Sequence, residues 1–122
     1  MADAKSILII DDDETLCTAL EAKFGSMGYT VTISKDGADG IEALQNTKFD
    51  VVITDLHMPN MNGFSVLEKV PDTQNADVPV YVITNLGSGQ HCEKAVKLGA
   101  KKCFVKSLIS LRDVVETINK AV

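Results

Sequence analysis

The sequence predicts an α/β fold, a parallel sheet of five strands that is covered by helices on both faces. Short apolar runs alternate with segments of helical periodicity along the chain, as the strands and helices of βα units do. The apolar runs are almost continuous, which is typical of strands buried on both faces of a parallel sheet. With 122 residues, the chain fits one ordinary domain over residues 1–122.

The first half of the chain contains three strand patterns, each followed by a helical pattern. The strands are expected at residues 7–10, 29–34 and 51–54. A first helix begins after Asp13, a suitable N-cap, and ends before Gly28, which stands where a C′ glycine is expected. A second helix follows a turn at Asp36, and a third ends before Pro71. The apolar positions of the three helices are Leu16, Leu20, Phe24 and Met27, then Ile41 and Leu44, then Phe64, Leu67 and Val70.

The second half of the chain repeats the pattern twice. Strands are expected at residues 80–84 and 102–105, and residues 72–77 form a polar loop. A short helix covers roughly residues 91–98 and is closed by Gly99. The last helix has apolar residues at positions i, i+3, i+4 and i+7, namely Leu111, Val114, Val115 and Ile118. Periodicity alone does not give the order of the five strands in the sheet.

Composition and charge narrow the classes of function. The hydrophobic fraction of 45% is enough for a core, and the charged fraction of 24% is ordinary for a globular protein. The net charge of −5 disfavours binding to nucleic acid or to an anionic membrane, since both require a basic surface. We see no signal-peptide pattern and no apolar run long enough to cross a bilayer. We therefore expect a cytoplasmic protein.

The cysteines fit that expectation. Cys17, Cys92 and Cys103 are widely spaced, odd in number, and lack the spacing of a metal site. Disulfides are rare in the cytosol. The three residues are therefore interpreted as reduced, structural thiols.

Carboxylates follow two of the predicted strands. Asp11 and Asp12 come directly after residues 7–10, and Asp55 comes after residues 51–54. The carboxyl ends of parallel strands share one edge of the sheet, where ligands bind. A helix start would explain Asp13 but not Asp11, because a charge at the end of a buried strand loses hydration and meets like charges. A divalent cation resolves that conflict, and Mg²⁺ prefers oxygen ligands of this kind.

Two further residues stand at the same predicted edge. Thr84 ends the fourth strand and Lys106 follows the fifth. Read singly, Thr84 is an ordinary strand residue, Lys106 a surface lysine and Asp55 a turn aspartate. Read together, they form a site in which Lys106 offsets the acidic charge and contacts a phosphoryl oxygen. A carboxylate in such a site can act as a nucleophile and form an aspartyl phosphate.

Four segments of the chain resemble the receiver domains of two-component response regulators. One matching segment is residues 49–63, and its part from Asp55 to Gly63 has the pattern Asp-x-x-Met-Pro-x-Met-x-Gly, which is highly specific in this context. The other matching segments are residues 7–14, residues 78–84, and Gly99-Ala100 leading to Lys106. The resemblance spans essentially the whole chain.

The resemblance implies a doubly wound, flavodoxin-like fold with five helices and the strand order 2-1-3-4-5. Asp55 would accept a phosphoryl group from a phosphohistidine on a sensor histidine kinase or phosphotransfer protein. Lys106 and Thr84 would contact the phosphoryl oxygens. Mg²⁺ would be bound by Asp12, Asp55 and the backbone carbonyl of His57, with Asp11 acting through water. Output to a downstream protein that the sequence does not identify would use the surface of the fourth helix, fifth strand and fifth helix.

The chain departs from the family pattern at several positions. Cys103 replaces an aromatic residue whose rotation reports phosphorylation, and Phe104 should face the other side of the sheet. Ser107 replaces a proline that often follows a cis bond, so we expect a trans bond or a strained loop. Asn85 is larger than the usual residue after the threonine. His57 and Leu86 stand where the family tunes dephosphorylation.

Three other functions compete with that of a signalling domain, and particular residues discriminate between them. A phosphatase of the aspartyl-phosphate type usually has a second aspartate two residues after its nucleophile, where this chain has His57. A pseudo-receiver would keep the fold without phosphorylation, which Cys103 and Ser107 make conceivable. A flavodoxin-like nucleotide binder would require a Gly-rich loop after the first strand, and none is present.

Overall fold

The computed structural model describes residues 4–85 and 89–122. Its strands are β1 (Ser6–Ile10), β2 (Thr30–Ser34), β3 (Val51–Thr54), β4 (Val80–Thr84) and β5 (Lys102–Val105). Its helices are α1 (Glu14–Ser26), α2 (Gly37–Asn46), α3 (Gly63–Lys69), α4 (Gly89–Lys97) and α5 (Leu111–Ala121), with a 3₁₀ turn η1 (Val70–Asp72) after α3. Each strand lies within one residue of its predicted bounds.

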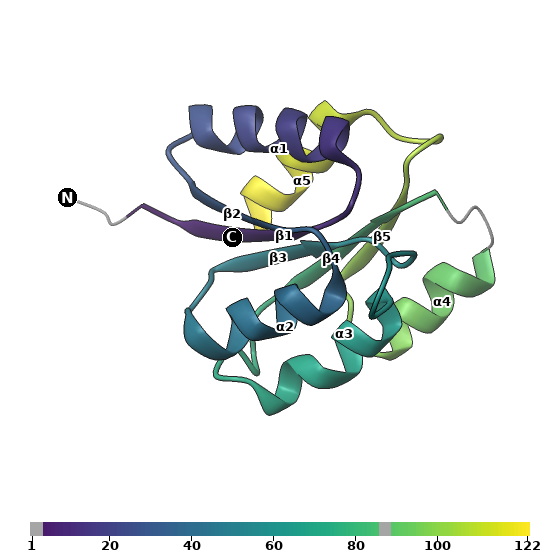
Figure 1. Ribbon diagram of the computed structural model, residues 1–122. Coiled ribbons are helices and arrows are strands. Elements are labelled where there is room, and N and C mark those ends of the chain that lie inside the picture. Colours follow the sequence, from purple (N-terminus) through teal and green to yellow (C-terminus); the bar gives the residue numbers. More distant parts are fainter. Residues whose placement is uncertain (1–3, 86–88) are drawn as a thin grey trace.

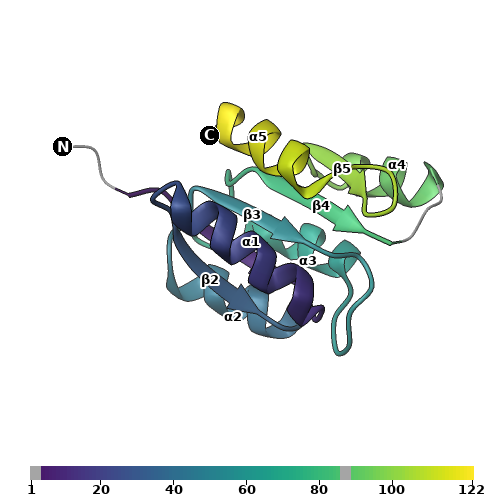
Figure 2. The ribbon, with the colours of Figure 1, turned by 90° about the horizontal axis from the view of Figure 1, so that it is seen from above.

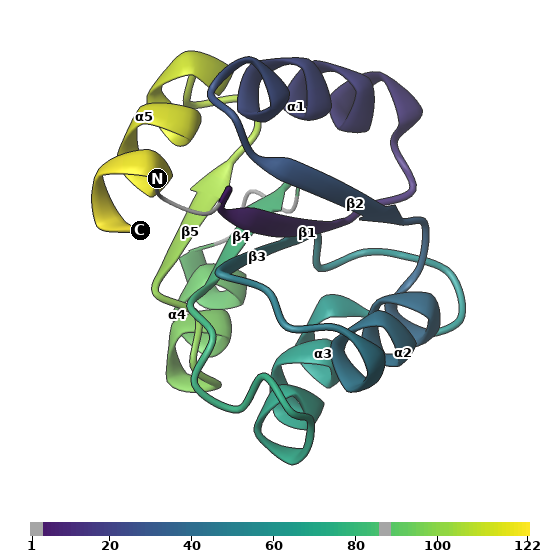
Figure 3. The ribbon, with the colours of Figure 1, turned by 90° about the vertical axis from the view of Figure 1, so that its left-hand side faces the viewer.

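The five strands form one parallel sheet in the order β2-β1-β3-β4-β5. Helices α1 and α5 cover one face, and α2, α3 and α4 cover the other (Figures 1 and 3). Seen from above, α1 and α5 both lie across the same side of the sheet (Figure 2). The doubly wound α/β fold that the resemblance implied is therefore confirmed.

Side chains of each central strand divide between two apolar cores. In β1, Leu8 and Ile10 pack toward α2 and α3, whereas Ile7 and Ile9 pack toward α1 and α5. Because both faces of β1 are covered, its residues from Ile7 onward are fully buried. This two-sided burial is the physical reason for the continuous apolar runs in the sequence.

The helices begin at polar caps that the sequence signals. Asp13, Asp36, Asn62 and Ser110 each accept a hydrogen bond from the backbone N–H three residues later. Gly28 has a φ of 89°, which favours glycine at the residue after a helix. Met27, the last apolar position of the expected first helix, lies beyond the end of α1 and is 41% exposed.

Asn75 organises the loop that was expected to be merely polar. Its side chain is buried and bonds three backbone groups. The amide nitrogen donates to the carbonyls of Leu44 and Thr47, each at 2.7 Å, and the amide oxygen accepts from the N–H of Phe49 at 2.8 Å. Asn75 thereby ties the end of α2 to the segment that enters β3.

Candidate functional site

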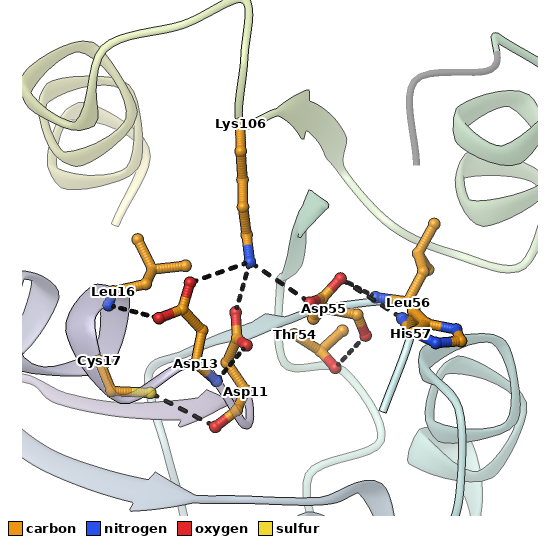
Figure 4. Close-up of polar contacts among 9 residues, drawn as sticks. All are labelled: Asp11, Asp13, Leu16, Cys17, Thr54, Asp55, Leu56, His57 and Lys106. Atoms are coloured by element: carbon orange, nitrogen blue, oxygen red, sulfur yellow. Dashed lines mark hydrogen bonds and ion pairs between the residues drawn. The ribbon is translucent and has the colours of Figure 1, made fainter. Parts of the chain in front are cut away.

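The carboxyl ends of β1, β3 and β5 bring three of the predicted residues together (Figure 4). The ammonium nitrogen of Lys106 lies 3.3 Å from Oδ2 of Asp11 and 3.4 Å from Oδ2 of Asp55. Both carboxylates are buried. Lys106 therefore extends into the acidic pocket, and its interpretation as a solvated surface lysine is wrong.

Backbone hydrogen bonds fix the three residues just past the strand ends. The N–H of Asp11 donates to Ser34, that of Asp55 to Ile10, and that of Lys106 to Thr84. Each bond extends a parallel strand pair by one residue. The side chains consequently project from the regular edge of the sheet, and their separation is set by strand geometry.

Burial makes the charge of Asp11 unfavourable. It raises the pKa of this carboxyl from 3.8 to about 6, although hydrogen bonds from Asp13 and Lys106 favour the charged form. The nearby charge of Asp55 adds to the increase. Burial alone would lower the pKa of Lys106, but the charges of Asp11 and Asp55 outweigh it and raise that pKa. The lysine thus remains a cation beside carboxylates that lack full compensation.

The two oxygens of Asp55 have different partners. Oδ1 accepts from the backbone N–H of Leu56 at 2.6 Å and from that of His57 at 3.4 Å. Oδ2 faces Lys106. Gly63 allows this arrangement, because a Cβ at that position would lie 2.1 Å from the carbonyl oxygen of Asp55. The glycine of the sequence pattern is therefore needed for the close approach of α3 to the aspartate.

A cavity of about 200 Å³ opens above the carboxylates. It is lined by Asp12, Asp13, Asp55, His57, Thr84, Asn85 and Lys106. Thr84, at the end of β4, thus reaches the same cavity as the acidic residues, as expected from its strand position. The cavity is large enough for a phosphoryl group with water, and it is open to a donor from outside.

The donor set also fits a hard divalent cation. Asp11, Asp12 and Asp55 each offer a carboxylate oxygen, and the three oxygens lie within 4.8 Å of one another. All are oxygen ligands, which suits Mg²⁺. Asp12 is exposed while the other two are buried, so a cation can enter the cluster from the solvent on the side of Asp12.

Two supporting contacts were not predicted. Asp13, expected only to begin a helix, also places Oδ2 at 3.9 Å from the ammonium of Lys106. The thiol of Cys17 donates to the backbone carbonyl of Asp11 at 3.4 Å, and burial, followed by the charge of Asp11, raises the pKa of that thiol to about 11. Cys17 lies one turn into α1, and no pattern in the sequence pointed to its hydrogen-bond partner.

The prediction of three free thiols is wrong for two cysteines. Cys92 of α4 and Cys103 of β5 form a disulfide, with their Cα atoms 5.4 Å apart, and Cys17 is free and buried. The two cysteines are 11 residues apart in the sequence. They become neighbours in space because α4 packs beside β5. Phe104 faces the opposite core, as alternation predicted.

The remaining departures have simpler outcomes. The bond between Lys106 and Ser107 is trans, because the described residues contain no cis peptide. Asn85 and His57 both line the cavity. Leu86 lies outside the described residues. Within the described part of the chain, no helix is long and apolar enough to span a membrane.

Comparison with known proteins identifies a family for nearly the whole chain. The family described as response regulator receiver domain matches residues 7–119. Transcriptional regulatory protein ZraR of Klebsiella oxytoca is 33% identical over 102 residues, which are 84% of this chain and 23% of that protein. Regulator of RpoS of Escherichia coli is 34% identical over 114 residues, 91% of this chain and 34% of that protein. The chain therefore spans about a quarter to a third of the length of these curated relatives.

Solved structures agree with the fold. A CheY-like receiver domain protein from Methanospirillum hungatei is 25% identical with a TM-score of 0.89, covering 98% of this chain and 94% of that one. The receiver domain of Francisella response regulator 1452 is 26% identical with a TM-score of 0.84, covering 95% of this chain and 94% of that one. Similarity at this level extends over complete domains.

Proposed function

We propose that Asp55 is the phosphoacceptor of this chain, which belongs to the response regulator receiver domain family and is a phosphoacceptor domain of two-component signalling. One observation carries the proposal. Oδ2 of Asp55 lies in the open cavity beside the ammonium of Lys106, while Oδ1 is held by backbone N–H groups. A carboxylate oriented in this way presents one oxygen to an incoming phosphorus atom.

The proposed reaction is transfer from a phosphohistidine of a sensor histidine kinase or a phosphotransfer protein. Oδ2 of Asp55 attacks the phosphorus, an O–P bond forms, the P–N bond breaks, and its electron pair returns to the imidazole. Lys106 and Thr84 border the cavity and would contact the oxygens of the transferred group. The cationic lysine stabilises the charge on those oxygens.

Magnesium is the metal that fits the site. Asp12 and Asp55 would hold the ion directly, Asp11 would hold it through water, and the backbone carbonyl of His57 would be a further ligand. When bound, Mg²⁺ supplies positive charge that offsets the carboxylates and the phosphoryl oxygens. The cluster of three carboxylate oxygens supports this assignment.

The output is proposed to be contact with another protein. The surface formed by α4, β5 and α5 would bind an unidentified downstream partner, and this domain would contact neither nucleic acid nor membrane. We place it in the cytoplasm and expect self-phosphorylation and autodephosphorylation as its sole chemistry. The functions of the longer relatives are not carried over, because the chain spans only about a quarter to a third of each.

Labelling with a small phosphodonor in the presence of Mg²⁺ tests the proposal. Wild type should be labelled, and Asp55→Asn should not be. Asp77→Asn is the matched control, because Asp77 is exposed in the segment before β4, and it should be labelled like wild type. Equal labelling of Asp55→Asn would reject Asp55 as the acceptor. Sustained turnover of a phosphomonoester would instead support a phosphatase.

A further inference from the structure

The disulfide joins two elements that both lead to the phosphoryl cavity. Cys103 pairs in register with Val82, and two residues further on Val105 pairs with Thr84. The next residue, Lys106, donates its N–H to Thr84. The partner cysteine lies in α4, which begins at Gly89, shortly after β4 ends at Thr84. The crosslink therefore ties α4 to the strand that carries Lys106.

Among the described residues, helix α4 buries little apolar surface against the sheet. One of its nine residues, Ala95, is buried, whereas α1 buries Cys17, Leu20 and Phe24. Its other contacts include a stack of His91 on Phe64 and the ammonium of Lys94 over the same ring at 4.4 Å. A helix with so little apolar burial opens easily. The covalent bond to Cys103 therefore adds to a small set of apolar and ring contacts.

The two cysteines lie at the surface, where a small or protein thiol can approach them. Cys92 and Cys103 are half-buried and line a shallow surface groove of about 450 Å³. Three lysines, Lys97, Lys101 and Lys102, and one acidic residue, Glu93, also line it, so the groove is net basic on a protein of net charge −5. Such a surface attracts anionic reagents such as glutathione. Cys17, by contrast, is buried, and its raised pKa keeps it a thiol.

We propose that Cys92 and Cys103 are a reversible dithiol–disulfide site that controls the mobility of α4 on β5. In the oxidised state α4 is fixed to β5, and in the reduced state it is free to move away. Its effect on the phosphoryl cavity, through Thr84 and Lys106, rests on the proposed function. Because α4 and β5 form part of the proposed output surface, the site would add a redox input to the phosphoryl signal.

The chemistry is thiol–disulfide exchange with a protein dithiol as the reductant. One thiolate of that dithiol attacks a sulfur of the pair, the S–S bond breaks, and a mixed disulfide forms. The second thiolate of the reductant then attacks its own bonded sulfur and releases the second cysteine. Two electrons and two protons reach Cys92 and Cys103, and the reductant becomes a disulfide. Oxidation by glutathione disulfide runs the same exchange in reverse.

The first experiment measures the site without phosphorylation. Wild type is treated with a reduced protein dithiol of the thioredoxin type or with glutathione disulfide, and alkylation of the native protein is then read by mass. The reduced form should gain two labels, which the oxidised form should lack. Backbone hydrogen exchange in α4 should be about tenfold faster after reduction, with α1 unchanged. The Cys92→Ser/Cys103→Ser variant should exchange fast after both treatments. A pair that resists reduction, fails to reoxidise, or leaves α4 exchange unchanged would overturn the proposal.

The second experiment separates this inference from the proposed function. Reduced and oxidised wild type are labelled with the small phosphodonor, and the rate of labelling and the lifetime of the phosphoryl group are compared. A change of about threefold or more, absent in the double serine variant, supports coupling to the cavity. Equal rates and lifetimes overturn that coupling. If neither form is labelled, Asp55 as acceptor is rejected, while the exchange result on α4 still decides the redox site.

Discussion

The two ends of strands β1 and β3 are built in opposite ways. At their carboxyl ends, Asp11 and Asp55 lie buried side by side, and burial raises the pKa of Asp11 to about 6. At their amino ends, polar groups are paired. The carboxylate of Asp50 accepts from the N–H of Ser6 at 2.7 Å, and Asn75 bonds three backbone groups between α2 and β3.

Along the same two strands, the amino ends contribute stability, whereas the carboxyl ends carry the candidate site. Buried polar groups that are fully bonded hold a fold in place, whereas a buried charge without full compensation costs stability. At the carboxyl end, a cation bound to the clustered carboxylates, as proposed above, would compensate such a charge. We therefore expect substitutions at the two ends to change stability in opposite directions.

The largest effect is expected at the amino end. Asn75→Ala would leave the N–H of Phe49 and the carbonyls of Leu44 and Thr47 without this partner. Each buried group left unbonded costs about 1–3 kcal/mol, so the free energy of unfolding should fall by about 4 kcal/mol. Urea unfolding measures it. Gln74→Ala is the control, since Gln74 is exposed with one bond to a backbone carbonyl. A loss below that of the control would contradict the assigned role.

At the carboxyl end, Asp11→Asn should stabilise the protein without metal. The folded pKa of Asp11, about 6, exceeds its ordinary 3.8, so the folded state binds the proton more tightly. The contribution of Asp11 to stability is therefore greatest below pH 3.8 and is lost as the pH rises to about 6. The shift corresponds to up to about 3 kcal/mol at pH 7. The extra stability of Asp11→Asn over wild type should vanish near pH 4. A difference in stability that does not depend on pH would show that ionisation of Asp11 is not its cause.

Metal binding should offset the loss of stability caused by the buried carboxylate charge at the carboxyl end. For the wild-type protein, Mg²⁺ at about 100 times its Kd should raise the free energy of unfolding by about 2.7 kcal/mol. Thermal unfolding with and without the ion measures the change. Asp12→Ala should lose most of it, because Asp12 supplies one of the clustered oxygens, whereas Asp77→Asn should keep it. Equal stabilisation of both variants would place the ion elsewhere.

The smallest effect is expected at a surface pair near the same edge. The ammonium of Lys35 lies 3.1 Å from Glu14, and both side chains are more than two thirds exposed. Water and salt screen such a pair, so Glu14→Gln should change the free energy of unfolding by less than about 0.5 kcal/mol. A larger change in urea unfolding at physiological salt would show that surface charge contributes to this end of the sheet.

The sequence was informative wherever strand geometry alone decides position. The meeting of Asp11, Asp55 and Lys106 follows from parallel strands that end at one edge, and apolar runs mark where those strands end. The Cys92–Cys103 pair required the packing of a helix on a strand, which periodicity does not describe. Asn75 was missed for a related reason: a polar residue in a loop gives no sign of burial or of its backbone partners.

The register of β5 on β4 decides which side chains of β5 face each core and where Lys106 lies. Among the strands of the described residues, β5 lies at the edge of the sheet and pairs with β4 alone, and an edge strand has a single neighbour to fix its alignment. Sliding it by one residue would exchange the faces of Cys103 and Phe104 and turn the lysine away from the aspartates. The sulfur bridge accepts one alignment, because only Cys103 can meet Cys92. The disulfide thereby holds β5 in the alignment that places the Lys106 ammonium beside the aspartates.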